Sequence, residues 1–393
     1  MPSRLTILIV ARDAGSTIAR AVRSARAETA CPLILVDDQS RDDTAARAQA
    51  SAGSSLRVLS TSMPGGVGAA RQLALSAVET EYAAWLDADD EWIAGRAARL
   101  TAMLDAGADV VTESIDLHDG VSGAWLRRLA VPEFLNVRGG AVRLFERNFL
   151  PGDTQVAFRT NAFRAAGGYD PAIRGPESFD VLLRALAQGA RFASGESVGY
   201  RMFAYEGSVS RNLERQRAAL AMALRKHEYE PVRRCYSAAG YPARIAAWAL
   251  VMLAQFRGDG EHALQFLDQA SPCDADPDEI LEPDGPWPYP EGWRRAFHRG
   301  TILLQARRDP IGAERELSRA ESFGPTAETA NNHGVALARM RRMGEARAAF
   351  TRATQRFSGY RDALINLSAA TPSCLTTHPL RRAASRSEYR VTA

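Results

Sequence analysis

The sequence of 393 residues is 46% hydrophobic and 24% charged, which is typical of a globular protein with room for two or three domains. Its formal net charge of +3 is small for this length and gives no reason to expect a nucleic acid partner. No signal peptide is visible, and the longest apolar stretch, residues 245–256, is too short for a transmembrane segment. Four scattered cysteines indicate neither a disulfide framework nor a metal site, so we expect a cytoplasmic protein: Cys31, Cys235, Cys273 and Cys374.

Strands and helices alternate along the first part of the chain. Apolar, β-rich runs predict buried strands at residues 5–10, 33–36, 56–59 and 82–87, and helices are expected between them at residues 18–27, 45–52 and 69–78. This alternation predicts an α/β fold with a doubly wound, mostly parallel sheet. A polar cluster follows each strand, and ligands of such sheets bind at the carboxyl ends of the strands.

The most distinctive cluster is acidic. Asp87, Asp89 and Asp90 follow a buried run directly, and carboxylates this close repel one another unless a cation lies between them. Mg²⁺ or Mn²⁺ takes one or two carboxylates together with phosphate oxygens, so the spacing predicts a metal that clamps a diphosphate. The alternative is an acidic turn that caps a helix beginning near Ile93.

Two further clusters suit a nucleotide. Asp38 would accept a hydrogen bond from a base N–H or a ribose hydroxyl, and the glycines of residues 65–68 would let backbone amides approach a phosphate at a helix N-terminus. Arg71, one turn into that helix, would pair with the nucleotide. The alternatives are a tight connection without a ligand and an arginine that faces solvent.

Together these clusters resemble the family 2 glycosyltransferases of the GT-A fold. Residues 36–44 (VDDQSRDDT) resemble the family's VDDGSTDGT, residues 64–71 (PGGVGAAR) its PGGVGAARN, and residues 86–90 its LDADD metal motif. The likeness covers roughly residues 4–200, and we assign residues 1–210 to the catalytic domain. It implies that Asp89 binds the metal, that Asp87 contacts the ribose or the metal shell, and that the nucleotide pocket is lined by Val10, Arg12, Asp38, Gly66, Arg71, Asp87 and Ala88. The family often has Tyr where this chain has Arg12.

The expected catalytic base is less clear from the sequence. Residues 175–184 (GPESFDVLLR) fall where the family has GGEDYDLWLR, so Glu177-Ser178 replaces the family's Glu-Asp pair. An inverting transfer needs a carboxylate near the acceptor to take its proton. Glu177 is the first candidate, with Asp180 and Asp153 next, and the alternative for Glu177 is an acid at a helix N-terminus.

The rest of the chain is predicted to be helical. Residues 211–258 are expected to form a connector, residues 259–372 a domain that resembles tetratricopeptide repeats, and residues 373–393 a loose tail. The evidence is a small-x₃-large-x₂-small pattern that occurs three times, and a generic helical bundle is the alternative. The three occurrences are Ala263, Leu267 and Ala270; Ala313, Leu317 and Ala320; and Ala346, Phe350 and Ala353.

The resemblance implies an inverting, metal-dependent transfer of a sugar from a nucleoside diphosphate sugar, in the first place a UDP sugar. A catalytic domain of this kind joined to helical repeats is similar to enzymes that glycosylate bacterial peptides, so we expect a peptide or protein acceptor with Cys, Ser or Thr. The alternatives are a cell-surface polysaccharide or lipid-linked glycan as acceptor, a nucleotidyltransferase, and a catalytically weak scaffold. The repeats could also form a homodimer.

Overall fold

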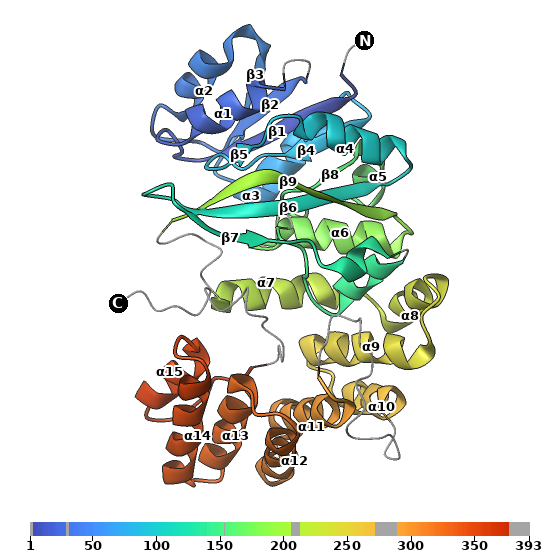
Figure 1. Cartoon of the computed structure of the whole chain (residues 1–393), viewed down its shortest axis with the longest axis vertical. Helices are drawn as coiled ribbons and strands as arrows, with labels where there is room; N and C mark the ends of the chain where they lie inside the picture. Colours follow the sequence, from blue (N-terminus) through green and yellow to red (C-terminus); the bar gives the residue numbers. More distant parts are fainter. Residues whose placement is uncertain are drawn as a thin grey trace. The chain divides into compact units, whose positions relative to one another are not determined.

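The computed structural model describes residues 3–28, 31–137, 139–152, 154–205, 213–271 and 289–376 (Figure 1). The chain divides into two compact units, Met1–Gly240 and Tyr241–Ala393, each described by itself below. The predicted connector is therefore divided between them. Helices α7 (Leu213–Arg225) and α8 (Tyr229–Ala238) belong to the first unit, whereas α9 (Ala243–Arg257) packs against α10 (Gly260–Ala270) in the second.

Within the described residues, nine strands of the first unit form one sheet in the order β3-β2-β1-β4-β8-β6-β9-β5, with β7 beside β6. Strands β1 to β4 are parallel to one another, β8 is antiparallel to both β4 and β6, and β6 is parallel to β9. The predicted α/β class with a mostly parallel sheet is therefore correct, although the antiparallel strands were not predicted. The strands are β1 Leu5–Ala11, β2 Leu33–Asp37, β3 Leu56–Ser60, β4 Tyr82–Trp85, β5 Glu91–Trp92, β6 Val110–Asp119, β7 Trp125–Leu129, β8 Ala157–Arg159 and β9 Phe192–Ala204.

Helices cover both faces of this sheet (Figure 1). Ile7 and Ile9 of β1 pack in one cluster with α1 (Ile18–Arg26), α2 (Thr44–Ala52) and α4 (Arg96–Asp105). Leu8 points to the opposite face and packs with the other three helices. Because both faces are buried, the strands are continuous apolar runs rather than alternating ones. The helices of the second face are α3 Val67–Ser76, α5 Thr160–Ala165 and α6 Glu177–Ala187.

Strand directions define one edge of the sheet as the candidate ligand side. Since β8 runs against both β4 and β6, the carboxyl ends of β1, β2, β4, β6 and β9 point the same way. Beyond β4 the acidic residues lead into β5, which pairs with β9, and α4 begins only at Arg96 after Gly95. The alternative in which the acids cap a helix from Ile93 is therefore wrong.

The second unit is built from helix pairs. The three predicted triads are buried and lie on the second helix of each pair, namely α10, α12 and α14. Each pair turns through one residue in the left-handed region, at Gly258, Arg308 and Arg341, with φ of +75°, +52° and +63°. Turn and triad thus recur together, as a helical repeat requires. The remaining helices are α11 Glu291–Ile302, α12 Pro310–Phe323, α13 Ala327–Arg339, α14 Met343–Arg356 and α15 Arg361–Ser368.

The expectations about the apolar stretch and about the tail can be compared with the structure. The apolar residues 245–256 form the buried part of α9, as a packed helix should. No helix in the described part of the chain has both the length and the apolar character needed to cross a membrane. By contrast, residues 373–376 of the predicted loose tail are held in place, because Asn332 hydrogen bonds to both the backbone N–H and the C=O of Thr376. Pro283, Pro286 and Pro288 fall outside the described residues, and Pro290 is the residue before α11.

Candidate active site

The loops that follow β1 and β2 interlock at the ligand side. The backbone N–H of Gly15 donates to Asp42 and that of Ala14 to the Thr44 hydroxyl, both at 2.8 Å. A Cβ atom at Gly15 would lie 2.6 Å from a carboxylate oxygen of Asp43, so a side chain there would have to displace that carboxylate. Asp42 and Asp43 therefore fix the shape of the loop, and Asp37 does so by accepting hydrogen bonds from Ser40.

Asp38 joins this loop to the glycine turn before α3. Its buried carboxylate accepts hydrogen bonds from the Thr61 hydroxyl at 2.8 Å and from the amides of Gly65 at 2.9 Å and Gly66 at 3.0 Å. The guanidinium of the half-exposed Arg12 lies 3.9 Å away. A carboxylate has about four acceptor positions, so a nucleotide hydroxyl or N–H can still be accommodated beside these donors.

The glycine turn presents the N-terminus of α3. Gly66, the residue before the helix, has a φ of +79°, which a residue with a side chain rarely adopts. No side chain among the described residues caps this end, so its first amides can bind an anion such as a phosphate. Two residues on, a Cβ atom at Gly68 would lie 3.4 Å from Cγ of Glu177, which places the candidate base against the same helix end.

Arg71 connects α3 to the acidic cluster. It is buried, donates to the Ser178 hydroxyl, and donates to Asp87 at 3.2 Å. Its guanidinium also lies 5.2 Å from the centre of the Trp85 ring. The alternative of a solvent-facing arginine is therefore wrong. Ser178, which stands where the resemblance leads one to expect an aspartate, accepts from Arg71, and Asp87 contributes a carboxylate that balances the arginine charge.

Three protein groups hold the carboxylate of Asp87, which stays partly exposed. Besides Arg71, its carboxylate accepts hydrogen bonds from Thr154 at 2.9 Å and Gln155 at 2.7 Å, and its backbone N–H donates to the hydroxyl of Tyr200 at 2.9 Å. These three residues were not predicted from the sequence. They come from segments far along the chain, and no local motif marks them.

The two acids that follow differ sharply. The carboxylate of Asp89 has no side-chain partner within the described residues, and burial together with the charge of Asp87 raises its pKa to about 6. Asp90 is buried and accepts a hydrogen bond from the backbone N–H of Phe203 at 2.8 Å. Burial, and then the charges of Asp89 and Asp87, raise the pKa of Asp90 well above its ordinary range. Asp90 therefore holds the backbone of β9, and Ala88 between the acids is buried. Asp89 is the acid that remains to bind a ligand.

These residues fit a hard divalent cation. A cation between Asp87 and Asp89 would relieve the repulsion and desolvation that raise the pKa of Asp89. Among the residues that the structure describes, no three His, Cys, Asp or Glu side chains converge to form a centre made by protein alone. Mg²⁺ often keeps only one or two carboxylates and completes its shell with water and substrate phosphates, and this donor set matches that arrangement.

The candidates for the catalytic base are in different environments. Glu177 is the first residue of α6, and its carboxylate accepts a hydrogen bond from the backbone N–H of Gly175 at 2.8 Å. Asp180 is fully buried and paired with Arg184 at 2.7 Å and with Lys226 at 3.0 Å. A carboxylate fixed between two cations cannot reach an acceptor, so we withdraw Asp180 as a base. Asp153 lies outside the described residues.

Comparison with known proteins decides the family. The model of glycosyl transferase family 2 matches residues 6–166. The succinoglycan biosynthesis protein ExoU of Rhizobium meliloti (strain 1021) is 31% identical over 262 residues, which are 58% of this chain and 75% of ExoU. The chain belongs to glycosyl transferase family 2. ExoO of the same organism, also a succinoglycan biosynthesis protein, is 31% identical over 231 residues, 53% of this chain and 63% of ExoO.

Solved structures confirm the fold class of this family 2 member. S. aureus TarS, residues 1–349, aligns over 91% of each chain with a TM-score of 0.50 and 14% identity. Its complex with UDP-GlcNAc aligns over 91% of this chain and 92% of TarS with a TM-score of 0.52. The predicted GT-A α/β domain followed by helices, and the prediction of a glycosyltransferase, are therefore confirmed. The comparisons do not confirm the tetratricopeptide likeness or a peptide acceptor.

Proposed function

We propose that this glycosyltransferase transfers a sugar from a nucleoside diphosphate sugar to a saccharide acceptor during polysaccharide synthesis, with inversion and with a divalent cation. One observation carries the proposal. Asp38, Gly66, Arg71, Asp87 and Glu177, from four separate segments, are joined by direct contacts around the N-terminus of α3.

The donor would lie across this end of α3. Asp38 and Arg12 would take the base or ribose, because they follow β1 and β2 at the ligand side and lie 3.9 Å apart. The free amides after Gly66 would hold the diphosphate, since a helix N-terminus favours negative charge. Asp89, assisted by Asp87, would hold the cation, which when bound neutralises charge that builds up on the leaving diphosphate.

Glu177 would take the proton of the acceptor hydroxyl. Its place beside Gly68 sets a carboxylate next to the phosphate cradle, and general-base catalysis requires such a group within hydrogen-bond reach of the acceptor. Ser178 would not replace it, because its hydroxyl is buried and occupied by Arg71. Arg71 in turn keeps Asp87 oriented and adds positive charge behind the donor.

The relatives favour a saccharide acceptor over a peptide. Two relatives at 31% identity carry names from succinoglycan biosynthesis, and succinoglycan is a polysaccharide. The peptide hypothesis depended on an open surface along the helical repeats. In the second unit, however, the buried Asn332 and Asn366 hydrogen bond to the chain's own residues Cys374 and Thr376. Part of the helical unit is thus covered by the chain itself. We keep the tetratricopeptide likeness and homodimer formation as hypotheses and propose no role for the repeats in acceptor binding.

The test is to measure donor hydrolysis and transfer with purified protein and a panel of sugar nucleotides, beginning with UDP sugars. We expect hydrolysis of one donor, stimulation by Mn²⁺ or Mg²⁺, loss with EDTA, and transfer to oligosaccharides derived from bacterial polysaccharides. Transfer to Cys- or Ser-containing peptides but not to any oligosaccharide would refute the saccharide acceptor. Release of pyrophosphate from a nucleoside triphosphate would indicate a nucleotidyltransferase, and no turnover of any donor would favour the scaffold.

A further inference from the structure

The hairpin between β6 and β7 exposes an unusual set of apolar side chains. Val121 is 91% exposed, Trp125 57% and Leu126 48%, all within six residues. The turn itself does not need them, because Asp119 closes it by accepting hydrogen bonds from the backbone N–H and hydroxyl of Ser122 at 2.7 Å. Three large apolar side chains that are exposed to solvent within six residues indicate a binding surface.

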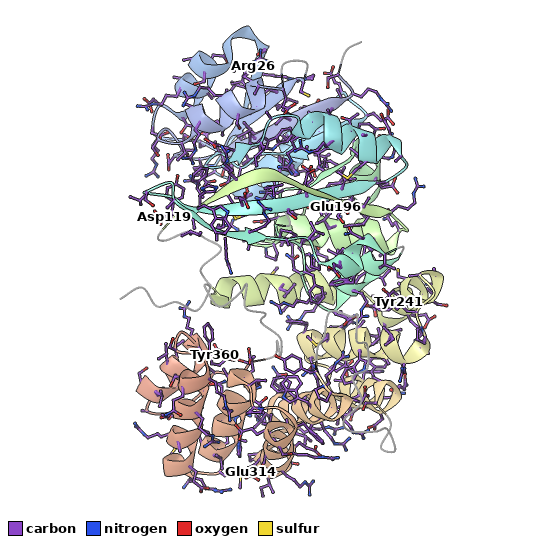
Figure 2. All side chains as sticks on the ribbon, viewed as in Figure 1. Arg26, Asp119, Glu196, Tyr241, Glu314 and Tyr360 are labelled. Carbon is purple, nitrogen blue, oxygen red and sulfur yellow. The ribbon has the colours of Figure 1, made fainter. Side chains whose placement is uncertain are left out.

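This hairpin projects from the ligand side of the sheet. Strand β6 runs in the same direction as β4 and β9, so the turn after Asp119 follows the carboxyl end of the strand. Figure 2 shows Asp119 at that end, where the hairpin extends beyond the neighbouring strands. The acidic cluster follows the carboxyl end of β4 at the same edge.

A continuous path of contacts joins the hairpin to Asp89. Arg20 donates to the backbone carbonyl of Asp89 and, at 3.1 Å, to the hydroxyl of Tyr205. The guanidinium of Arg20 also lies 3.7 Å from the centre of the Phe203 ring, and that ring lies 5.5 Å from His118. A set of four contacting residues therefore connects the candidate metal ligand Asp89 with the base of the hairpin: Arg20, Tyr205, Phe203 and His118.

The indole of Trp125 is held in place at the end of this path. Trp125 pairs with His118 across the hairpin, and its indole is near enough to Asp116 to help Arg128, 2.9 Å away, lower the pKa of that carboxylate. Nearby, a Cβ atom at Gly120 would lie 2.5 Å from the Tyr205 ring, so the ring packs directly on the hairpin backbone. The result is an oriented aromatic ring that is still largely open to solvent.

We propose that Trp125, flanked by Val121 and Leu126, is a platform on which a sugar ring of the acceptor saccharide stacks. The inference depends on the proposed function and names the acceptor subsite of that function. A sugar ring has a face of C–H groups with hydroxyls at its rim, so an aromatic ring binds the face while the hydroxyls stay hydrated. An anionic lipid surface fits less well, because the charge of Arg128 is balanced by Asp116.

The experiment uses the full chain and compares Trp125→Ala, Trp125→Phe and a control, Ile311→Ala, whose side chain is 69% exposed in the second unit. The substrate is an oligosaccharide that the wild type accepts. Trp125→Ala should raise its KM roughly three- to tenfold, the size of a lost aromatic contact. Phe should restore most of the affinity, the control should match the wild type, and all variants should hydrolyse the donor normally.

Other outcomes would overturn the platform. An unchanged acceptor KM in Trp125→Ala, with wild-type transfer intact, would refute this inference but leave the proposed function standing. Loss of binding to anionic phospholipid vesicles in Trp125→Ala, with that KM unchanged, would make the hairpin a membrane contact instead. If the wild type itself transfers to no saccharide while it hydrolyses the donor, the proposed acceptor class fails, and the platform fails with it.

Discussion

Replacing Asp89 with Asn should make the metal-free protein more stable and catalytically inactive. Burial and the charge of Asp87 raise the pKa of Asp89 from 3.8 to about 6. Each pKa unit corresponds to about 1.4 kcal/mol, so holding the ionised carboxylate in the metal-free fold costs about 3 kcal/mol. A neutral amide of the same shape does not carry that cost.

The pH dependence follows from the sign of the shift. Between pH 4 and 6 the folded state binds more protons at Asp89 than the unfolded state, so stability falls as pH rises through this window. The gain from Asp89→Asn should be complete above about pH 7 and absent near pH 3. For a unit of this size, about 3 kcal/mol corresponds to a rise in Tm of roughly 6–10 °C.

The assay is thermal unfolding in EDTA at several pH values, together with transfer activity in Mn²⁺. Asp90→Asn is the matched control, because Asn has the shape of Asp and its amide oxygen can still accept a hydrogen bond from the Phe203 amide. We expect the control to retain activity. If Asp89→Asn is no more stable than the wild type at neutral pH, then the ionised Asp89 carboxylate does not destabilise the metal-free fold. Turnover that survives both this substitution and EDTA would refute the metal assignment.

Three further predictions concern the base, the phosphate cradle and the helical unit. Glu177→Gln should lower transfer about 10²- to 10⁴-fold with donor binding nearly unchanged, as measured by kinetics and calorimetry; transfer within a few-fold of wild type would place the base elsewhere. Gly66→Ala, at a φ of +79° and a ψ of 172°, should cost about 1–3 kcal/mol and weaken nucleoside diphosphate binding in calorimetry, and unchanged affinity would argue against the cradle. Deleting residues 241–393, the second unit, should preserve donor hydrolysis and saccharide transfer; loss of transfer alone would place the acceptor on the helices.

Much of the first unit could be predicted because its signals are local. The apolar runs of β1 to β4 and the glycines before α3 each encode their structure within a few residues. Strand β8, by contrast, is three residues long and is defined by β4 and β6 on either side. Residues 157–159 form a strand because they pair with strands that are distant in sequence, and a local sequence pattern does not reveal those partners.

The same limit applies to the second unit and to residues 373–376. The triads on α10, α12 and α14 are helix-packing patterns, so they were found from spacing alone. The segment at Thr376 looked loose because its composition is that of a tail. It is ordered by the side chains of Asn332 and Asp362, which come from two different helices.

The acidic cluster shows most clearly where sequence reasoning ends. Asp87, Asp89 and Asp90 have identical side chains within four positions, yet Asp87 is held by Arg71 and Asp90 is buried against a backbone amide. The difference arises from α3 and β9, which supply the partner of one acid and bury another. Asp89 receives no such partner from the described residues, and burial together with the charge of Asp87 raises its pKa to about 6. A group that the fold leaves uncompensated in this way gains more than its neighbours from a bound cation, and so it is the position at which ligand binding and stability are coupled most strongly.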